Sequence, residues 1–241
     1  FGPEEDTREL VSALKETPGI LRAEPHYTGA LSLVPNDTYY SQTSDHLGRI
    51  GVEDAWDVQA GGSSSLLVAV IDSGVDAGHE DLASAIDTAS YNFVDDDTNI
   101  FDDRNHGTRV AGIIAAEGNN SRGIAGIAYG VKIVSCDVVD STGVLTTART
   151  VQAINHAIAQ GAKIINMSLS FFADSEILES AINSAAQSAV LVASAGNEGQ
   201  GDTPVYPASY EAVIGVGATE LDSDRRASFS NYNGLNSSAV D

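Results

Sequence analysis

Residues 105–116 read Asn-His-Gly-Thr-Arg-Val-Ala-Gly-Ile-Ile-Ala-Ala, a polar start that turns into a run of small and apolar residues. A helix with apolar residues on every side is normally a buried one. Ala111, Gly112 and Ala115 are small enough to let neighbouring backbone approach closely. The stretch therefore predicts a central helix packed inside a sizeable domain, with His106 at its N-terminal end.

Two predicted strands deliver polar side chains that could partner this histidine. The apolar run 65–71 ends at Asp72, and the run 189–193 leads into a glycine-containing loop with Asn197. Short continuous apolar runs are typical of buried parallel strands, whose C-terminal ends collect functional groups. A lone histidine near an apolar run is more often a core residue. An aspartate, a histidine and an asparagine in this order, however, indicate a hydrolase that orients an imidazole with a carboxylate and binds an oxyanion with an amide.

Three motifs resemble those of the subtilisin-like serine peptidases. They are Val70-Ile71-Asp72-Ser73-Gly74-Val75-Asp76, His106-Gly107-Thr108-Arg109-Val110-Ala111-Gly112 and Ser194-Ala195-Gly196-Asn197-Glu198-Gly199. They stand in the family's order, and the resemblance runs from about Pro35 to the last residue. It implies an α/β fold with a doubly wound, mostly parallel sheet and helices on both faces. It also implies that His106 is the general base, that Asp72 fixes its tautomer and that Asn197 donates to the oxyanion.

The histidine motif departs from the family pattern at two positions. Arg109 replaces the common histidine, and Asn105 replaces a glycine, which is a mild change because asparagine tolerates a left-handed turn. Two opposing fields would act on His106. The helix N-terminus disfavours the imidazolium and the Asp72 carboxylate favours it, and the sequence leaves open which effect is larger.

The family's nucleophile has no counterpart in this sequence. In the family it lies in a Gly-Thr-Ser-x-Ala segment after the region matching 226–232, and the sequence reaches Asp241 without one. The chain is therefore expected to be a fragment of a serine endopeptidase that is inactive by itself. The alternative is a non-catalytic peptide-binding scaffold descended from a peptidase.

The resemblance also places an extended peptide substrate between two segments, bound through their backbones as an added strand. The predicted substrate-binding residues are Val139, Ser141, Thr142 and Gly143 in one segment, and Ser168, Leu169 and Ser170 in the other. The floor of the main side-chain pocket is predicted at Ser194, Ala195 and Gly196. Ser170 stands where the family usually has glycine, so the width of that pocket stays open.

A structural calcium site is implied at positions matching the family's ligands. Asp37, Asp81 and Asn120 occupy these positions and carry the oxygen atoms that Ca²⁺ requires. Zinc is disfavoured, because His79-Glu80 is not followed by a second histidine at the required spacing and Cys136 is the single cysteine.

An acidic run of residues 95–97, with Asp102 and Asp103, precedes the histidine motif. We interpret it as a solvated loop, with a metal site as the alternative.

The composition is strongly acidic, with 12 Lys and Arg against 34 Asp and Glu and a formal net charge of −22. Such a surface repels nucleic acids and anionic membranes, so neither is expected as a partner. Adaptation to a saline medium, a capacity for Ca²⁺ and a simple solvated surface all remain open as explanations. No Gly-x-Gly-x-x-Gly or Walker-type loop follows a predicted strand, which argues against nucleotide binding.

Residues 1–34 are predicted to form the C-terminal part of a prodomain and a processing linker. Apolar residues at helical spacing precede Pro18-Gly19, and a short strand is predicted at 20–27. This order resembles the end of the family's inhibitory prodomain, which would act as an intramolecular chaperone and inhibitor. An unrelated helical hairpin is the alternative. Residues 35–241 are then a peptidase domain truncated at its C-terminus.

The acidic residues 1–6 are unlike a signal peptide, so the sequence starts inside a longer precursor or belongs to the cytoplasm. The resemblance favours a secreted, monomeric enzyme that acts on polypeptides.

Overall fold

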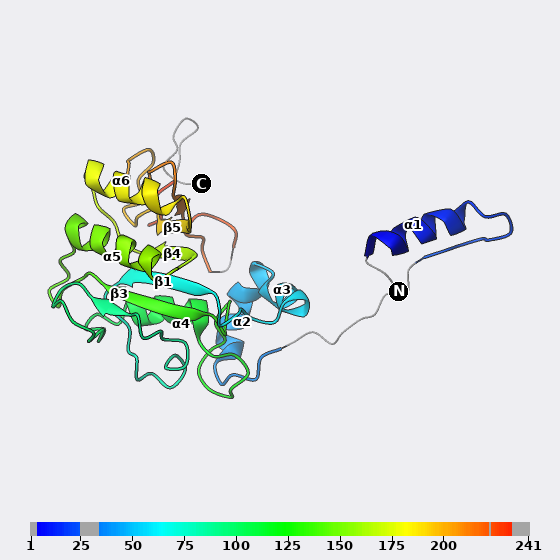
Figure 1. Ribbon diagram of the computed structural model, residues 1–241, viewed down its shortest axis with the longest axis horizontal. Helices are drawn as coiled ribbons and strands as arrows, with labels where there is room; N and C mark the ends of the chain where they lie inside the picture. Colours follow the sequence, from blue (N-terminus) through cyan, green and yellow to red (C-terminus); the bar gives the residue numbers. More distant parts are fainter. Residues whose placement is uncertain (1–3, 25–33, 222, 233–241) are drawn as a thin grey trace. The chain divides into compact units, whose positions relative to one another are not determined.

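The computed structural model describes residues 4–24, 34–221 and 223–232. The chain divides into two compact units, Phe1–Ser32 and Leu33–Asp241. The first contains helix α1 (Glu4–Lys15), which Figure 1 shows in blue.

The strand predicted at 20–27 is wrong over its described part. Residues 20–24 have no regular structure, and Leu21 is 98% exposed. A strand needs a neighbour to pair its backbone, and the described part of this unit contains no second strand. Residues 25–27 lie outside the described ranges.

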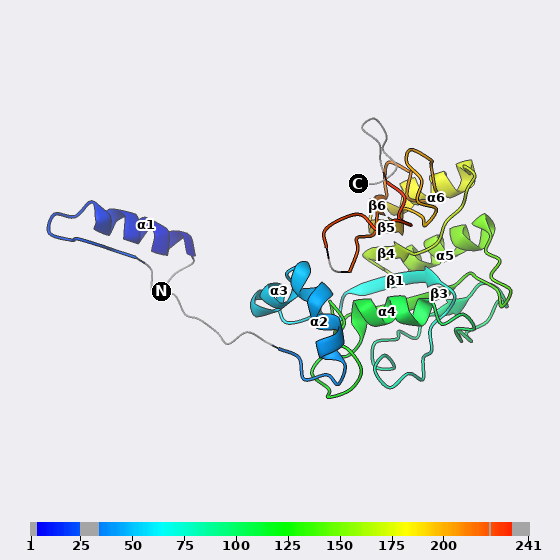
Figure 2. The same ribbon diagram turned by 180° about the vertical axis from the view of Figure 1, so that it is seen from behind.

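A six-stranded parallel sheet forms the centre of the second unit, with strand order β2-β3-β1-β4-β5-β6 (Figures 1 and 2). Its strands are β1 (Leu67–Asp72), β2 (Tyr91–Asn92), β3 (Lys132–Asp137), β4 (Ile164–Met167), β5 (Val190–Ser194) and β6 (Ile214–Val216). From β1 the chain goes to the edge strand β2, returns to β3 beside β1, and then crosses to β4 on the other side of β1. This reversal leaves a crevice at the C-terminal end of β1, where ligands of doubly wound sheets bind.

Helices pack on both faces of this sheet, which confirms the predicted fold class. The helices of the unit are α2 (Tyr40–Arg49), α3 (Val52–Val58), α4 (Gly107–Ala115), α5 (Thr147–Ala159) and α6 (Glu176–Ala185). No helix within the described ranges combines the length and the apolar character needed to cross a membrane.

Residues 67–71 of strand β1 are all apolar because both faces of the strand are covered. Ala69 and Ile71 belong to a core cluster with α5 and α6, whereas Val68 and Val70 belong to a second cluster with α4. Side chains alternate across a strand, so a strand between two helical layers needs apolar residues at every position.

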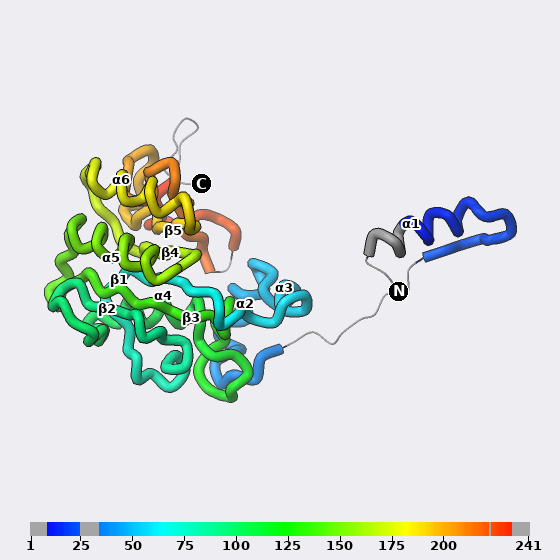
Figure 3. Tube along the Cα trace, in the orientation of Figure 1, coloured from blue at the N-terminus to red at the C-terminus, as the bar shows by residue number. Residues whose placement is uncertain are grey.

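Helices α5 and α6 run side by side over one face (Figure 3). Each begins at a hydroxyl cap: Thr146 Oγ1 accepts from the Arg149 amide at 3.2 Å, and Ser175 Oγ accepts from the Leu178 amide at 3.4 Å. Leu178 and Ile182 of α6 are fully buried in the core cluster.

The opposite face of the sheet is only partly covered by the described residues. Helix α4 packs over β1 and β3, while Val190 of β5 and Ile214 and Val216 of β6 are 50%, 46% and 48% exposed. Ile113 of α4 is also 51% exposed. The prediction that the 105–116 helix is buried on every side is therefore wrong, because its packing is confined to one side.

We expect Leu178→Ala to lower the free energy of unfolding by about 2–5 kcal/mol, because it removes a fully buried side chain and leaves a cavity. The adjacent Ile177 is 72% exposed, so Ile177→Ala is a matched control that should cost less than about 0.5 kcal/mol. Urea unfolding monitored by circular dichroism measures both. Equal losses would contradict the assignment of this helix face to the core.

Candidate active site

The N-terminus of α4 is anchored to the C-terminal end of β1. Ser73 Oγ accepts from the Gly107 amide at 3.1 Å, and Asp102 Oδ2 accepts from the Thr108 amide at 2.8 Å. These bonds satisfy two of the free amides of the first helical turn. His106 holds the N-cap position but makes no capping bond with its side chain, so its imidazole is available for another contact.

The junction between α4 and the end of β1 requires a close approach of the two backbones. A Cβ atom on Gly107 would lie 2.1 Å from the Gly74 carbonyl oxygen, so only glycine fits there. Asn105 adopts a left-handed conformation with φ of 55°, which turns the chain just before His106. Asparagine tolerates this conformation better than most residues do.

Asp72 and His106 form the central pair of the site. The distance between His106 Nδ1 and Asp72 Oδ1 is 2.7 Å, and Asp72 is only 3% exposed. Asp72 Oδ1 also accepts from the Ser73 amide at 2.8 Å. Because a carboxylate accepts hydrogen bonds, Nδ1 carries the proton and the lone pair of Nε2 is free. Nε2 makes no hydrogen bond within the described residues.

The Asp72 contact raises the pKa of His106 above its ordinary value of 6.5. The hydrogen bond to Asp72 is the largest cause, and the negative charges of Asp72 and Asp102 act in the same direction. Partial burial and the Arg109 charge lower the pKa but are outweighed. The sequence indicates two opposing influences on the pKa of His106, the helix N-terminus and the Asp72 carboxylate. Of these two, the carboxylate is a cause of the raised pKa.

Asp102 is a structural residue that sequence reasoning missed. It is 4% exposed, and its Oδ1 accepts from the Ser73 hydroxyl at 2.8 Å. Its Oδ2 accepts from both the amide and the hydroxyl of Thr108. The interpretation of the acidic run as a solvated loop is therefore wrong for this residue, although residues 95–97 are exposed.

A cavity of about 360 Å³ opens beside His106. It brings together six predicted site residues, Asp72, His106, Val139, Gly143, Ser168 and Leu169. It is also lined by Ser73, Arg104 and Leu145, which were not predicted as site residues. The cavity lies between the two segments predicted to flank a peptide.

The other predicted site residues do not line this cavity. Ser141 and Thr142 line a neighbouring hollow. Ser170 and Ser194 are half-buried, and Ala195 and Gly196 are buried. Asn197 is exposed, and its backbone amide donates to Glu198 Oε2 at 3.0 Å.

The loop that carries Asn197 is held by Asn231, another residue that the sequence did not indicate. Asn231 is 3% exposed, and its Nδ2 donates to the Ala195 carbonyl at 3.0 Å and to Glu198 Oε2 at 2.8 Å. A Cβ atom on Gly196 would lie 2.4 Å from this Nδ2, which explains the glycine.

Asp137 is a further acidic group near the site. It lies at the end of β3 in register with Asp72, and burial is the largest cause that raises its pKa to about 7. Asp137 lines the neighbouring hollow and not the cavity of His106.

The predicted calcium ligands lie together. The Asn119 amide donates to Asp37 Oδ2 at 2.9 Å, and Asn120 Nδ2 donates to Asp81 Oδ1 at 2.7 Å. Asp37 and Asp81 are 5% and 2% exposed, and no lysine or arginine among the described residues forms an ion pair with either.

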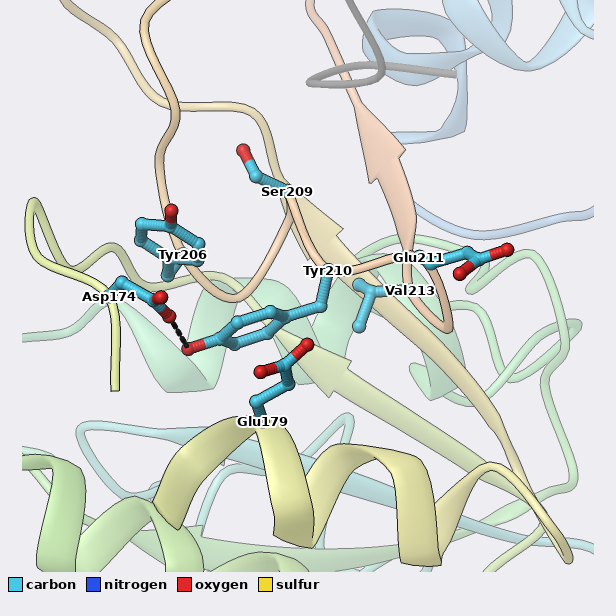
Figure 4. Close-up of a pocket in the computed structure, with 7 residues that line it drawn as sticks. All are labelled: Asp174, Glu179, Tyr206, Ser209, Tyr210, Glu211 and Val213. Carbon is cyan, nitrogen blue, oxygen red and sulfur yellow. Dashed lines mark hydrogen bonds between the residues drawn. The ribbon is translucent and has the colours of Figure 1, made fainter. Parts of the chain in front are cut away.

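A larger cavity of about 550 Å³ lies elsewhere on the second unit (Figure 4). In it Tyr210 donates a hydrogen bond to Asp174 at 3.0 Å, with Tyr206 and Glu179 close by. None of the predicted site residues lines it, so its size alone does not make it the reaction site.

The fold and this site define an α/β protein with an aspartate–histidine pair at the strand ends of a parallel sheet. The model of the subtilase family (peptidase S8) matches residues 63–239. The chain therefore belongs to the subtilase family.

Known proteins agree with this assignment. The chain is 44% identical over 224 residues to the thermophilic serine proteinase of Bacillus sp. (strain AK1), covering 92% of this chain and 55% of that protein. It is 39% identical to thermitase of Thermoactinomyces vulgaris, covering 82% of this chain and 70% of thermitase. Against the first of these relatives, the chain thus spans about half of the full length.

Solved structures show the same fold. A protease from Pseudoalteromonas arctica superposes with a TM-score of 0.75 at 27% identity, covering 87% of this chain and 71% of that one. A cold-adapted subtilisin-like serine proteinase superposes with a TM-score of 0.63 at 32% identity, covering 75% of this chain and 63% of that one.

We expect Asp72→Asn to lower the pKa of His106, because it removes both the charge and the strongest hydrogen-bond acceptor next to Nδ1. An NMR titration of the imidazole Hε1 proton measures this shift. Asp103→Asn, an exposed change in the adjacent loop, is the control that should leave the midpoint in place.

The same pair links folding to pH. The pKa of His106 is higher in the folded protein than in the unfolded chain. The stability that the Asp72–His106 pair contributes is therefore fully present below about pH 6.5 and is lost as the pH rises through the pKa of folded His106. An unchanged His106 midpoint in Asp72→Asn would contradict the pairing.

Proposed function

We propose that the complete protein is a serine-type endopeptidase that hydrolyses peptide bonds of polypeptides. A serine hydroxyl attacks the peptide carbonyl carbon while His106 Nε2 takes the hydroxyl proton. The imidazolium then gives this proton to the leaving amine, and a water molecule deprotonated by the same Nε2 hydrolyses the serine ester that remains. Asp72 holds the imidazole in the tautomer with its proton on Nδ1 and stabilises the cation that forms.

The 2.7 Å contact between His106 Nδ1 and buried Asp72 is the observation that carries this proposal. It leaves Nε2 free at a cavity that Val139 and Gly143 line from one segment and Ser168 and Leu169 from another. Peptide binding between the segments around Val139–Gly143 and Ser168–Ser170 is part of the proposal, with the pocket floor at Ser194–Gly196.

We assign the oxyanion amide to Asn197. The exposed side chain of Asn197 follows β5, and Asn231 holds the loop that carries it. An amide donor aimed at the developing oxyanion stabilises the transition state more than it stabilises the substrate.

We infer that the nucleophilic serine is supplied by polypeptide beyond Asp241, so that residues 1–241 alone are inactive. Among the described residues, no serine is hydrogen-bonded to His106. The half-exposed apolar side chains of Val190, Ile214 and Val216 support a further segment that covers this part of the sheet.

A non-catalytic peptide-binding scaffold is the second candidate. It would use the same cavity and would need no nucleophile. The site disfavours it, because a scaffold has no need for a buried carboxylate that raises the pKa of His106.

We propose a structural Ca²⁺ at Asp37, Asp81 and Asn120. Asp37 and Asp81 supply carboxylate oxygens, which Ca²⁺ prefers, and these two buried carboxylates have no ion-pair partner in the described parts of the chain. A Cβ atom on Gly123 would lie 2.0 Å from Asp81 Oδ2, so the loop wraps closely around this carboxylate. A bound cation would balance the two charges and join segments distant in sequence.

We further propose that residues 1–34 are the end of an inhibitory prodomain with its processing linker. The boundary between the two compact units, after Ser32, supports this division. One relative is named a minor extracellular protease, which supports secretion. We expect the mature enzyme to act as a monomer.

Asn197→Ala in the complete enzyme should lower kcat by about 10²- to 10³-fold with little change in KM, a magnitude established on subtilisin for loss of one oxyanion donor. Steady-state hydrolysis of a chromogenic peptide measures both constants. Asn183→Ala, which truncates another exposed amide on α6, is the control. A rise in KM alone would show that Asn197 shapes the pocket, and absence of any turnover in the wild type would favour the scaffold.

Removal of Ca²⁺ from the metal-loaded protein should lower the melting temperature by about 5–10 °C, since a ligand at 100 times its Kd stabilises by about 2.7 kcal/mol. Asp81→Asn should make the melting temperature insensitive to chelator. Asp54→Asn, an exposed change on α3, should keep the sensitivity. A melting curve that the chelator leaves in place in the wild type would rule out the site.

A further inference from the structure

Arg104 borders the cavity that holds His106. It is the one lysine or arginine among the described residues that line this cavity. Its backbone amide donates to Asp102 Oδ1 at 3.1 Å, which ties it to the anchored end of the loop. Because Asn105 turns the chain with a positive φ, Arg104 and His106 face the same hollow from positions two residues apart.

The guanidinium of Arg104 lies against the opposite segment of the cavity wall. Its Nη1 donates to the Ser141 carbonyl at 3.3 Å. A Cβ atom on Gly143 would lie 3.0 Å from Nη2, and Gly143 has a φ of 90°. The side chain therefore spans from the histidine loop to the segment predicted to flank a peptide, and that contact occupies one of its five N–H donors.

The charge of Arg104 has no partner within the described residues. No carboxylate there forms an ion pair with it. Asp140, in the facing loop, is engaged elsewhere: its Oδ1 accepts from the amide and hydroxyl of Thr142, and its Oδ2 lies 3.9 Å from Arg149. The chain has a net charge of −22, so an unpaired cation at the site distinguishes the cavity from the negative surface around it.

We propose that Arg104 makes the enzyme prefer substrates with aspartate or glutamate at the position whose side chain enters this cavity. This specificity rests on the proposed function, because it requires a peptide lying between the two flanking segments. The apolar walls formed by Val139, Leu145 and Leu169 accept the methylene part of such a side chain. The carboxylate then reaches the free donors of the guanidinium, a geometry that suits paired hydrogen bonds.

The preference is limited to one position. The remaining surface is strongly negative and repels peptides with several acidic residues. The preferred substrate therefore carries a single acidic side chain beside the cleaved bond, with neutral or basic residues elsewhere.

The test is a peptide scan with the complete enzyme, in which a single aspartate is moved through the three positions on either side of the cleaved bond. Each peptide is compared with its asparagine isostere. At one position, kcat/KM should favour aspartate over asparagine by about 2- to 5-fold, the range for a partly exposed charge pair. Arg104→Gln should bring this ratio close to 1, and Arg104→Glu should shift the preference to lysine. Arg109→Gln removes an equal charge five residues away, outside the cavity, and should keep the wild-type ratio.

Cleavage with no aspartate preference at any position, or a preference that persists in Arg104→Gln, overturns the inference and leaves the proposed function standing. Absence of all cleavage overturns the proposed function instead. In that case the same peptides are bound to the complete His106→Ala protein and followed by fluorescence anisotropy. Tighter binding of the aspartate peptide that is lost in His106→Ala/Arg104→Gln supports the role of Arg104, and equal binding of both peptides overturns it.

Discussion

The site depends on the close contact between the N-terminus of α4 and the C-terminal end of β1. Gly107 allows the approach because no Cβ fits against the Gly74 carbonyl. Ser73 and Asp102 then take the first two helix amides, so the His106 side chain does not have to cap its own helix. The imidazole is free to meet Asp72, and the pKa of His106 rises as a result. Without the Asp72 contact, the pKa of His106 would lose the largest influence that raises it.

The sheet explains why this contact forms where it does. β1 lies at the middle of the strand order, and chain crossings to either side leave its C-terminal end open. Both faces of β1 are packed, and its last residue, Asp72, lies buried at this opening. The uncovered part of the sheet at β5 and β6 lies beside the loop of Asn197.

Features carried by local sequence could be predicted, and features that join distant segments could not. β1, β5 and α4 follow from the apolar runs at 65–71, 189–193 and 105–116, whereas β2 and β6, with two and three residues, are too short to give a pattern. Asp102 and Asn231 act on residues that come from other segments, and an acidic or amide residue in a loop has no distinguishing local signal. How much of Ile113 is exposed depends on which segments pack against α4, and a helical pattern in the sequence does not show this.

The central claim is that the Asp72–His106 pair activates a serine that lies beyond Asp241. Labelling of the complete protein with phenylmethylsulfonyl fluoride, followed by mass spectrometry of the labelled peptide, tests it most directly. The account predicts one sulfonylated serine C-terminal to Asp241, with labelling lost in His106→Ala. A label on a serine within residues 1–241, or labelling of His106→Ala at the wild-type rate, would contradict it.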